Sequence, residues 1–175
     1  MIKTFDLKKD ELNLEFDYNL KETEKINSSI QNIRENKEEL KIDNLRQIAL
    51  WKINRVVDIP QELIKQLEEL TKQKNLDINN QEIKDLIEKL VSCKGVGYPM
   101  ASTILKFIRP DKFPIIDARA YRVLYGKKIY PRQYNLELYY KYIEVIKKIS
   151  KEQKIPLNQV DEQLYLFDKK HNKTL

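Results

Sequence analysis

The sequence is poor in the residues that form disulfides and most metal sites. It contains a single cysteine, Cys93, and a single histidine, His171, which lies in a polar C-terminal segment. One cysteine cannot form an internal disulfide or a four-cysteine zinc or iron–sulfur site. One histidine argues against a histidine-based metal site and against a Ser–His–Asp triad. We therefore expect no cofactor and no bound metal, and we expect Cys93 to be a small buried residue.

Long hydrophobic runs are also missing. No apolar stretch approaches the roughly 18 residues that a membrane span needs. The first residues, MIKTFDLKKDELNLEF, alternate charged and apolar side chains and lack the apolar stretch of a secretory signal. With 41% hydrophobic and 34% charged residues, the chain has enough apolar side chains for a core. We expect a soluble, cytoplasmic, monomeric protein that does not bind membranes.

Positive charge is concentrated in one part of the chain. Residues 1–44 hold 8 Lys/Arg and 11 Asp/Glu, a balance of −3, whereas residues 94–132 hold 9 Lys/Arg and 2 acidic residues, a balance of +7. A focused basic surface attracts polyanions, nucleic acid above all. The same charges are also compatible with a solvated face that has no partner.

Helical spacing of apolar residues dominates the sequence. We expect helices over residues 19–41, 42–59, 60–74, 79–93, 98–108, 117–126, 133–150 and 157–170. The only strand signal is a possible short pair at residues 2–7 and 12–18. The predicted class is all-α, with about eight helices and short connections. We expect one helical domain over residues 1–175, in which the acidic residues 1–41 can form an N-terminal appendage.

Two of the three glycines, Gly95 and Gly97, lie two residues apart between two predicted helices. Glycine provides positive φ or close backbone approach in a tight turn. Amides at such a turn and at the start of the next helix can bind a phosphate oxygen. Val96 would point inward, and Lys94 would add positive charge. The structural alternative is an ordinary joint between two helices.

The surrounding pattern resembles the helix-hairpin-helix DNA glycosylase superfamily, which includes endonuclease III and the adenine and alkylpurine glycosylases. The resemblance covers residues 83–124. The segment VSCKGVG (91–97) is similar to the hairpin of that family, and Ala101 falls where the family packs a small residue. The loop RPDKFPIID (109–117) is similar to the connection that follows. Asp117 comes twenty residues after Gly97, where the family has its catalytic aspartate.

The resemblance implies a role for Asp117 in breaking the N-glycosidic bond of a flipped base. A fixed carboxylate stabilises the positive charge that develops on the sugar, and it can orient a water molecule for attack. The structural alternative for Asp117 is a helix N-cap, because aspartate is favoured at that position.

One departure from the family changes the expected chemistry. Bifunctional members have a lysine two residues after the second hairpin glycine, and that lysine forms a Schiff base with the sugar. Here that position is Pro99, and Lys94 lies on the other side of the turn. The four-cysteine iron–sulfur cluster of many relatives is also missing. We therefore expect a monofunctional enzyme in which water is the nucleophile.

Further candidate residues surround this centre. The expected DNA-binding residues are Lys94, Gly95, Val96, Gly97, Tyr98, Arg119 and Lys127. Arg119 and Arg122 are expected to face different ways on their helix, so that at most one of them meets phosphate. The expected base-pocket or wedge residues are Trp51, Lys52 and Arg55, with a core role for Trp51 as the alternative.

The function predicted from the sequence is base-excision DNA repair by a monofunctional DNA glycosylase, a hydrolase that acts on an altered base in double-stranded DNA. Asp117 is the predicted catalytic residue. The first alternative is a helix-hairpin-helix DNA-binding protein without catalytic activity. The second is a helical adaptor whose basic segment binds an acidic protein partner.

Overall fold

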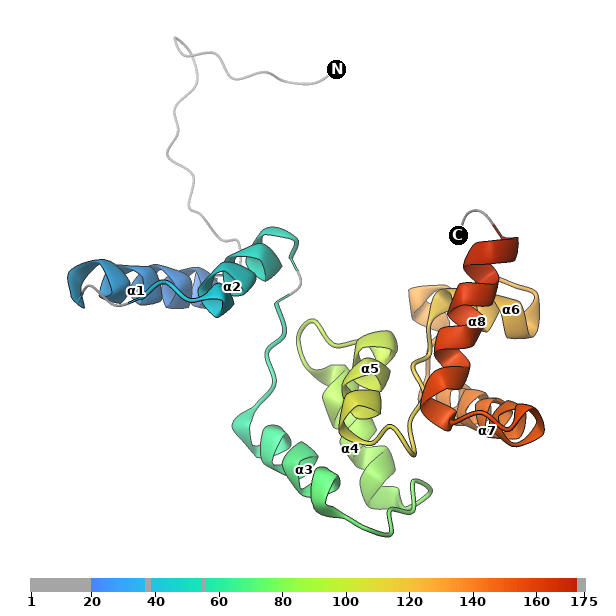
Figure 1. Ribbon diagram of the computed structural model, residues 1–175. Helices are drawn as coiled ribbons and strands as arrows, with labels where there is room; N and C mark the ends of the chain where they lie inside the picture. Colours follow the sequence, from blue (N-terminus) through green and yellow to red (C-terminus); the bar gives the residue numbers. More distant parts are fainter. Residues whose placement is uncertain (1–19, 37–38, 55, 173–175) are drawn as a thin grey trace. The chain divides into compact units, whose positions relative to one another are not determined.

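The computed structural model describes residues 20–36, 39–54 and 56–172 (Figure 1). The strand pair predicted at residues 2–7 and 12–18 lies outside the described residues, and so does Arg55. The described residues divide into two compact units, one ending at Val56 and the other beginning at Val57. The first unit therefore includes the second helix in addition to residues from the possible N-terminal appendage, residues 1–41.

Within the described residues the structure contains eight α-helices and one short 3-10 helix. They are α1 (Leu20–Asn36), α2 (Ile42–Lys52), α3 (Gln61–Lys72), α4 (Gln81–Ser92), α5 (Tyr98–Ile108), α6 (Ala118–Tyr125), η1 (Pro131–Gln133), α7 (Leu136–Gln153) and α8 (Leu157–His171). The only β-type pairing among these residues is an isolated antiparallel bridge between Asp58 and Lys94. The predicted all-α class with about eight helices is confirmed.

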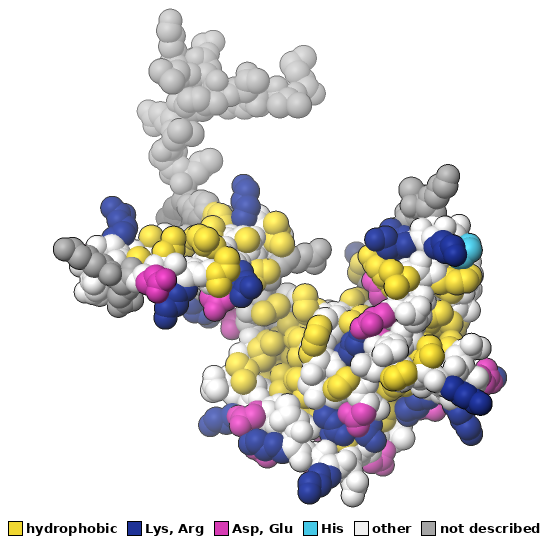
Figure 2. Space-filling model, in the orientation of Figure 1, with side chains coloured by type: hydrophobic (Ala, Val, Ile, Leu, Met, Phe, Trp, Pro, Cys, Tyr) yellow, Lys and Arg dark blue, Asp and Glu magenta, His cyan; other side chains and the backbone are white. Residues whose placement is uncertain are grey.

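The first unit is a pair of helices, α1 and α2, that lie side by side (Figure 1). Polar contacts join them: the Trp51 indole donates to Thr23 Oγ1 at 2.9 Å, and Asn44 Nδ2 donates to Ser29 Oγ at 3.1 Å. Neither helix contains a buried residue. Figure 2 accordingly shows hydrophobic side chains on the surface of this pair.

The predicted helix over residues 42–59 is shorter in the structure and ends at Lys52. Asn54 has a φ of 54°. This left-handed backbone is incompatible with a continuing helix, and asparagine adopts it more easily than most residues.

The second unit contains α3 to α8 and has its own hydrophobic core. Apolar residues at helical spacing point inward, as Ile83, Leu86, Ile87 and Leu90 do on α4. Helix α8 packs against both α6 and α7 (Figure 1). The largest fully buried apolar side chains are Leu70, Ile87, Leu90, Leu105, Phe113, Ile116, Tyr139, Tyr142, Ile143, Ile146 and Val160.

Local sequence signals fix several helix ends. Asn80 caps α4 by accepting from the Glu82 amide, and Asn135 caps α7 by accepting from the Leu138 amide. Helix α6 begins after Asp117 and ends at Gly126, whose φ is 65°. The predicted N-cap and stop of α6 are therefore confirmed. In the part of the chain that the structure describes, no helix combines the length and the apolar character needed to cross a membrane.

Candidate active site around Asp117

Helices α4 and α5 are joined by a five-residue connection, Cys93–Gly97. The Val96 amide donates to the Cys93 carbonyl at 3.0 Å and closes a four-residue turn. Gly95 is the third residue of this turn, and its φ is 79°. A positive φ at this position requires glycine in most turns of this kind. The fold itself therefore explains Gly95.

Gly97 is different, because its backbone is extended with φ −100° and ψ 178°. A Cβ atom added there would meet only the Pro99 Cδ atom, at an ordinary contact distance of 3.9 Å. Nothing inside the fold therefore demands glycine at position 97. Gly97, Pro99 and Met100 are exposed, and amides at the start of a helix can bind an anion.

The residues around the two glycines show which side of the turn faces the solvent. Val96 is buried, as predicted, and Lys94 is exposed. Lys94 also accepts a hydrogen bond at its carbonyl from the Asp58 amide at 3.0 Å, which fastens the turn to the segment before α3. The partly exposed Cys93 departs from the expectation of a buried thiol.

Tyr98 lies in the core rather than on the surface. Its hydroxyl donates to Glu88 on α4, and its ring packs edge-on against Tyr139 with centroids 6.4 Å apart. Burial and the neighbouring Glu88 carboxylate raise the pKa of Tyr98. The expectation that the Tyr98 side chain contacts DNA is corrected: the ring anchors the start of α5 and is not available for stacking on a base.

Asp117 is partly exposed at the N-terminus of α6. Its Oδ1 accepts hydrogen bonds from the Arg119 amide at 2.7 Å and from the Ala120 amide at 3.4 Å. The carboxylate is thus a true N-cap, as the structural alternative predicted. Capping through Oδ1 also fixes the orientation of the side chain.

The loop before Asp117 is held by side chains from three helices. Tyr139 and Tyr142 of α7 donate their hydroxyl hydrogens to the carbonyls of Pro114 and Ile115, each at 3.0 Å. The Ile115 amide donates to Asp161 Oδ2 on α8 at 2.8 Å. These bonds hold the extended backbone that carries Asp117.

The remaining bond comes from α5. The Ser102 hydroxyl on α5 donates to the Pro99 carbonyl at 2.9 Å and accepts from the Ile116 amide at 3.1 Å. One buried hydroxyl group therefore lies between the first turn of α5 and the residue before Asp117. Rigid support of this kind is what a preorganised site requires.

A cavity of about 410 Å³ opens beside Asp117. Ligand pockets commonly have volumes of about 300–1,000 Å³. Its lining residues are Ile115, Asp117, Asp161, Glu162, Tyr165 and Leu166. The cavity thus combines apolar and aromatic walls with three carboxylate side chains.

Asp161 is the most buried of these carboxylates, with 3% of its surface exposed. Burial raises the pKa of Asp161, while the Ile115 amide and the Lys106 ammonium group, 3.6 Å away, act in the opposite direction. The pKa of the Tyr142 hydroxyl is affected by burial and by two carboxylates, those of Asp161 and Asp117. Its pKa lies well above the ordinary value, first because the hydroxyl is buried and then because Asp161 and Asp117 lie near it.

Arg119 and Arg122 both bind one buried carboxylate, that of Asp168 on α8. Arg119 Nη1 lies 2.9 Å from Asp168 Oδ2, and Arg122 donates to both oxygens at 2.9 and 2.7 Å. The expectation that the two arginines face different ways is wrong, because residues three apart on a helix share a face. Arg119 would have to leave this internal ion pair to contact a phosphate.

The basic segment is less positive at the surface than its composition suggests. Lys106 and Arg109 are buried, and they pair with Glu162 and Asp111 respectively. Together with Arg119 and Arg122, four of the nine cations in residues 94–132 are held in ion pairs. The exposed cations of this segment are Lys94, Lys127, Lys128 and Arg132. Lys127 therefore keeps its predicted place on the surface, just after Gly126.

The predicted wedge residues belong to the first unit. Trp51 is partly buried at the end of α2, and Lys52 is exposed. The hydrogen bond from Trp51 to Thr23 serves the contact between α1 and α2. Trp51 therefore has a structural contact between α1 and α2, although its side chain is only partly buried.

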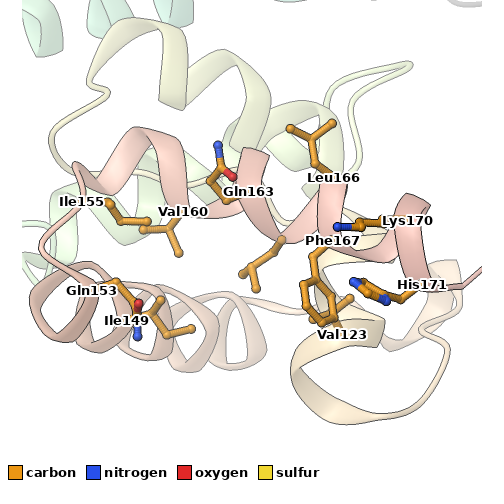
Figure 3. Close-up of a pocket in the computed structure, with 11 residues that line it drawn as sticks. Val123, Ile149, Gln153, Ile155, Val160, Gln163, Leu166, Phe167, Lys170 and His171 are labelled. Atoms are coloured by element: carbon orange, nitrogen blue, oxygen red, sulfur yellow. The ribbon is translucent and has the colours of Figure 1, made fainter.

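A larger cavity, of about 780 Å³, lies between α6, α7 and α8 (Figure 3). Figure 3 shows Phe167 and His171 against Val123 of α6, with Ile149 and Gln153 of α7 at the other end. No carboxylate is among its lining residues. The smaller cavity beside Asp117 therefore has the groups for hydrolytic chemistry, although it is not the largest one.

Sequence reasoning missed Asp161, Glu162 and Tyr165, all on α8. One signal was available: Asp161 and Asp168 lie seven residues apart on the same helix face as Val160 and Leu164. Acidic residues on the inward face of an amphipathic helix are rarely buried without a partner or a function.

Comparisons of the chain with protein-family models, with curated proteins and with solved structures find no match. The assignment of a function rests on the residues and the geometry of this site.

Proposed function

We propose that the protein is a monofunctional DNA glycosylase of the helix-hairpin-helix type. It hydrolyses the N-glycosidic bond of an altered base in double-stranded DNA, and it acts as a cytoplasmic monomer. The observation that carries the proposal is the position of Asp117. Its carboxylate caps α6, is held in one orientation and lines a cavity, and its loop is joined through Ser102 to the helix that follows the glycine turn.

The two glycines support the DNA-binding part of the proposal. Gly95 has the positive φ that makes the turn, and the exposed Gly97 adds no side chain just before the start of α5. A phosphate bound at these amides benefits from the positive end of the helix dipole. The exposed Lys94 and Lys127 add electrostatic attraction for the duplex.

The chemistry that we propose uses water as the nucleophile. A base flipped out of the duplex enters the cavity, so that its sugar faces Asp117. As the C1′–N bond lengthens, the bond's electrons move to the base and positive charge develops on the sugar. The Asp117 carboxylate stabilises that charge and accepts a proton from the attacking water, while the departing base takes a proton from solvent. Pro99 stands where a Schiff-base lysine would be needed, so no covalent intermediate is formed.

Asp117→Asn is the decisive substitution, because asparagine caps a helix about as well as aspartate does. The variant should fold and bind duplex DNA like the wild type but release no base. The assay is excision from a panel of lesion-bearing duplex oligonucleotides, with Glu144→Gln on the exposed side of α7 as the control for loss of one negative charge. Base release by Asp117→Asn at the wild-type rate contradicts the proposal.

A second candidate function is DNA binding without catalysis. The observation that favours it is the use of Asp117 Oδ1 as an N-cap, because a capping role explains this residue without chemistry. Under this alternative the wild type binds duplex DNA with a steep salt dependence and releases none of the bases in the panel.

A further inference from the structure

One residue that lines the cavity beside Asp117 has a polar side-chain atom that the fold leaves without a partner. Asp161 Oδ1 is buried and has no hydrogen-bond partner among the described residues. The other oxygen, Oδ2, is fully engaged, because it accepts from the Ile115 amide at 2.8 Å and lies 3.6 Å from Lys106 Nζ. A buried acceptor without a donor is costly, so it indicates a missing donor.

The cavity walls show where such a donor would come from. Asp161 lines the cavity together with Tyr165 and Leu166, whose side chains are 38% and 53% exposed. Exposed side chains of this kind commonly change rotamer when a ligand binds. A ligand in the cavity needs a rotamer change of this kind to reach Oδ1, because that atom is buried in the structure.

Lys106 and the two nearby tyrosine hydroxyls do not supply the donor. Lys106 is directed to Glu162 and to the Oδ2 side of Asp161. The hydroxyl of Tyr142 donates to the Ile115 carbonyl, and that of Tyr139 donates to the Pro114 carbonyl. These tyrosines hold the Asp117 loop and have no second hydrogen to donate.

We propose that Asp161 Oδ1 accepts a hydrogen bond from an N–H group of the base bound in the cavity. The site then selects bases that present an N–H donor, such as an exocyclic amino group, to α8. A base without such a donor leaves Oδ1 unpaired and is bound more weakly. The inference rests on the proposed function for the DNA context, but the selection between bases can be measured on free bases.

Asp161→Asn is expected to invert this selection. In the variant, the side-chain carbonyl should remain at the Oδ2 position, because both the Ile115 amide and Lys106 favour an oxygen there. The amide nitrogen then occupies the Oδ1 position, so the acceptor in the cavity becomes a donor. The volume of the side chain hardly changes.

The test uses two pairs of N-methylated bases, which differ only in the amino group and are titrated against the full chain. The pairs are 9-methyladenine with 9-methylpurine, and 1-methylcytosine with 1-methylpyrimidin-2-one. The wild type should bind the amino-bearing member of at least one pair about tenfold more tightly. The Asp161→Asn variant should lose or reverse this ratio, and Glu144→Gln should keep the wild-type ratio.

Equal affinity within both pairs overturns the inference, and so does the absence of binding by all four bases. An unchanged ratio in Asp161→Asn also overturns it. If the variant does not fold, the affinity ratios of the wild type alone test the inference. These affinities are then measured from the shift of the Ile115 amide resonance during titration, because that amide donates to Asp161. Discrimination between free bases without excision from any oligonucleotide would contradict the proposed function and leave the base selection standing.

Discussion

The Ser102 hydroxyl accepts a hydrogen bond from the Ile116 amide at 3.1 Å, while its hydrogen goes to the Pro99 carbonyl. Helix α5 and the residue before Asp117 therefore share one buried hydroxyl group. This contact fixes the start of α5 relative to Asp117. A phosphate bound at the start of α5 and a sugar facing Asp117 would therefore have fixed relative positions. The proposed enzyme needs such a link between phosphate binding and the catalytic carboxylate.

The first prediction concerns this link. Ser102→Ala leaves the Ile116 amide buried without an acceptor, which should cost about 1–3 kcal/mol of folding free energy. It should also lower the rate of base release more than it weakens duplex binding, because Asp117 loses its connection to α5. Chemical denaturation, a binding titration and single-turnover excision measure the three effects.

Thr103→Ala is the matched control. Thr103 also donates its hydroxyl hydrogen to the Pro99 carbonyl, at 2.8 Å, but its hydroxyl has no hydrogen bond to the Asp117 loop. This variant should remain close to the wild type in excision. Equal loss of excision in both variants would show that the Ser102–Ile116 contact has no special role.

The second prediction separates the two glycines of the turn. Gly95→Ala places a side chain at a φ of 79° and should destabilise the fold by about 1–2 kcal/mol. Gly97→Ala has ordinary backbone geometry and open space for Cβ, so stability should hardly change. Duplex binding should nevertheless weaken in Gly97→Ala, because the methyl group adds bulk beside the proposed phosphate site. Thermal unfolding and a DNA titration test both variants, and wild-type binding by folded Gly97→Ala would argue against a phosphate site there.

The sequence predicts features that depend on neighbouring residues better than features that depend on residues far apart in the chain. The α6 boundaries follow from Asp117 and Gly126, since capping and left-handed turns are properties of neighbouring residues. Asp168 and Asp161 could not be assigned this way, because their partners on α5, on α6 and before Asp117 are more than forty residues away. The charge of residues 94–132 was overestimated for the same reason: distant carboxylates neutralise part of it.

The third prediction concerns acid stability. Hydrogen bonds from Arg122, Asn172 and Arg119 hold the pKa of Asp168 well below its ordinary value. A lowered folded-state pKa means that Asp168 stabilises the fold at every pH above its unfolded-state pKa of about 3.9. This stabilisation is lost as the pH falls further, through the folded-state pKa.

Asp168→Asn should therefore lower the melting temperature at pH 7 and flatten the pH dependence of stability below pH 4. Asp85→Asn is the control, because Asp85 is an exposed carboxylate on α4 whose side chain accepts a hydrogen bond from the neutral Gln81, so its loss should change stability little at either pH. Thermal unfolding between pH 2 and pH 7 measures the effect. An equal loss of melting temperature at pH 2 and pH 7 would contradict the role given to the Asp168 carboxylate.

The fourth prediction concerns the exposed cations near the site. If Lys127 contacts a phosphate, Lys127→Gln should weaken binding to all duplex sequences alike and lower the slope of log K against log salt by about 1. Lys141→Gln is the control: Lys141 is equally a surface lysine, but it lies on α7 in an ion pair with Glu137. Loss of the same charge there should leave the slope unchanged. Binding titrations of one duplex at several salt concentrations give both slopes, and an equal change in the two variants would reduce the role of Lys127 to net charge.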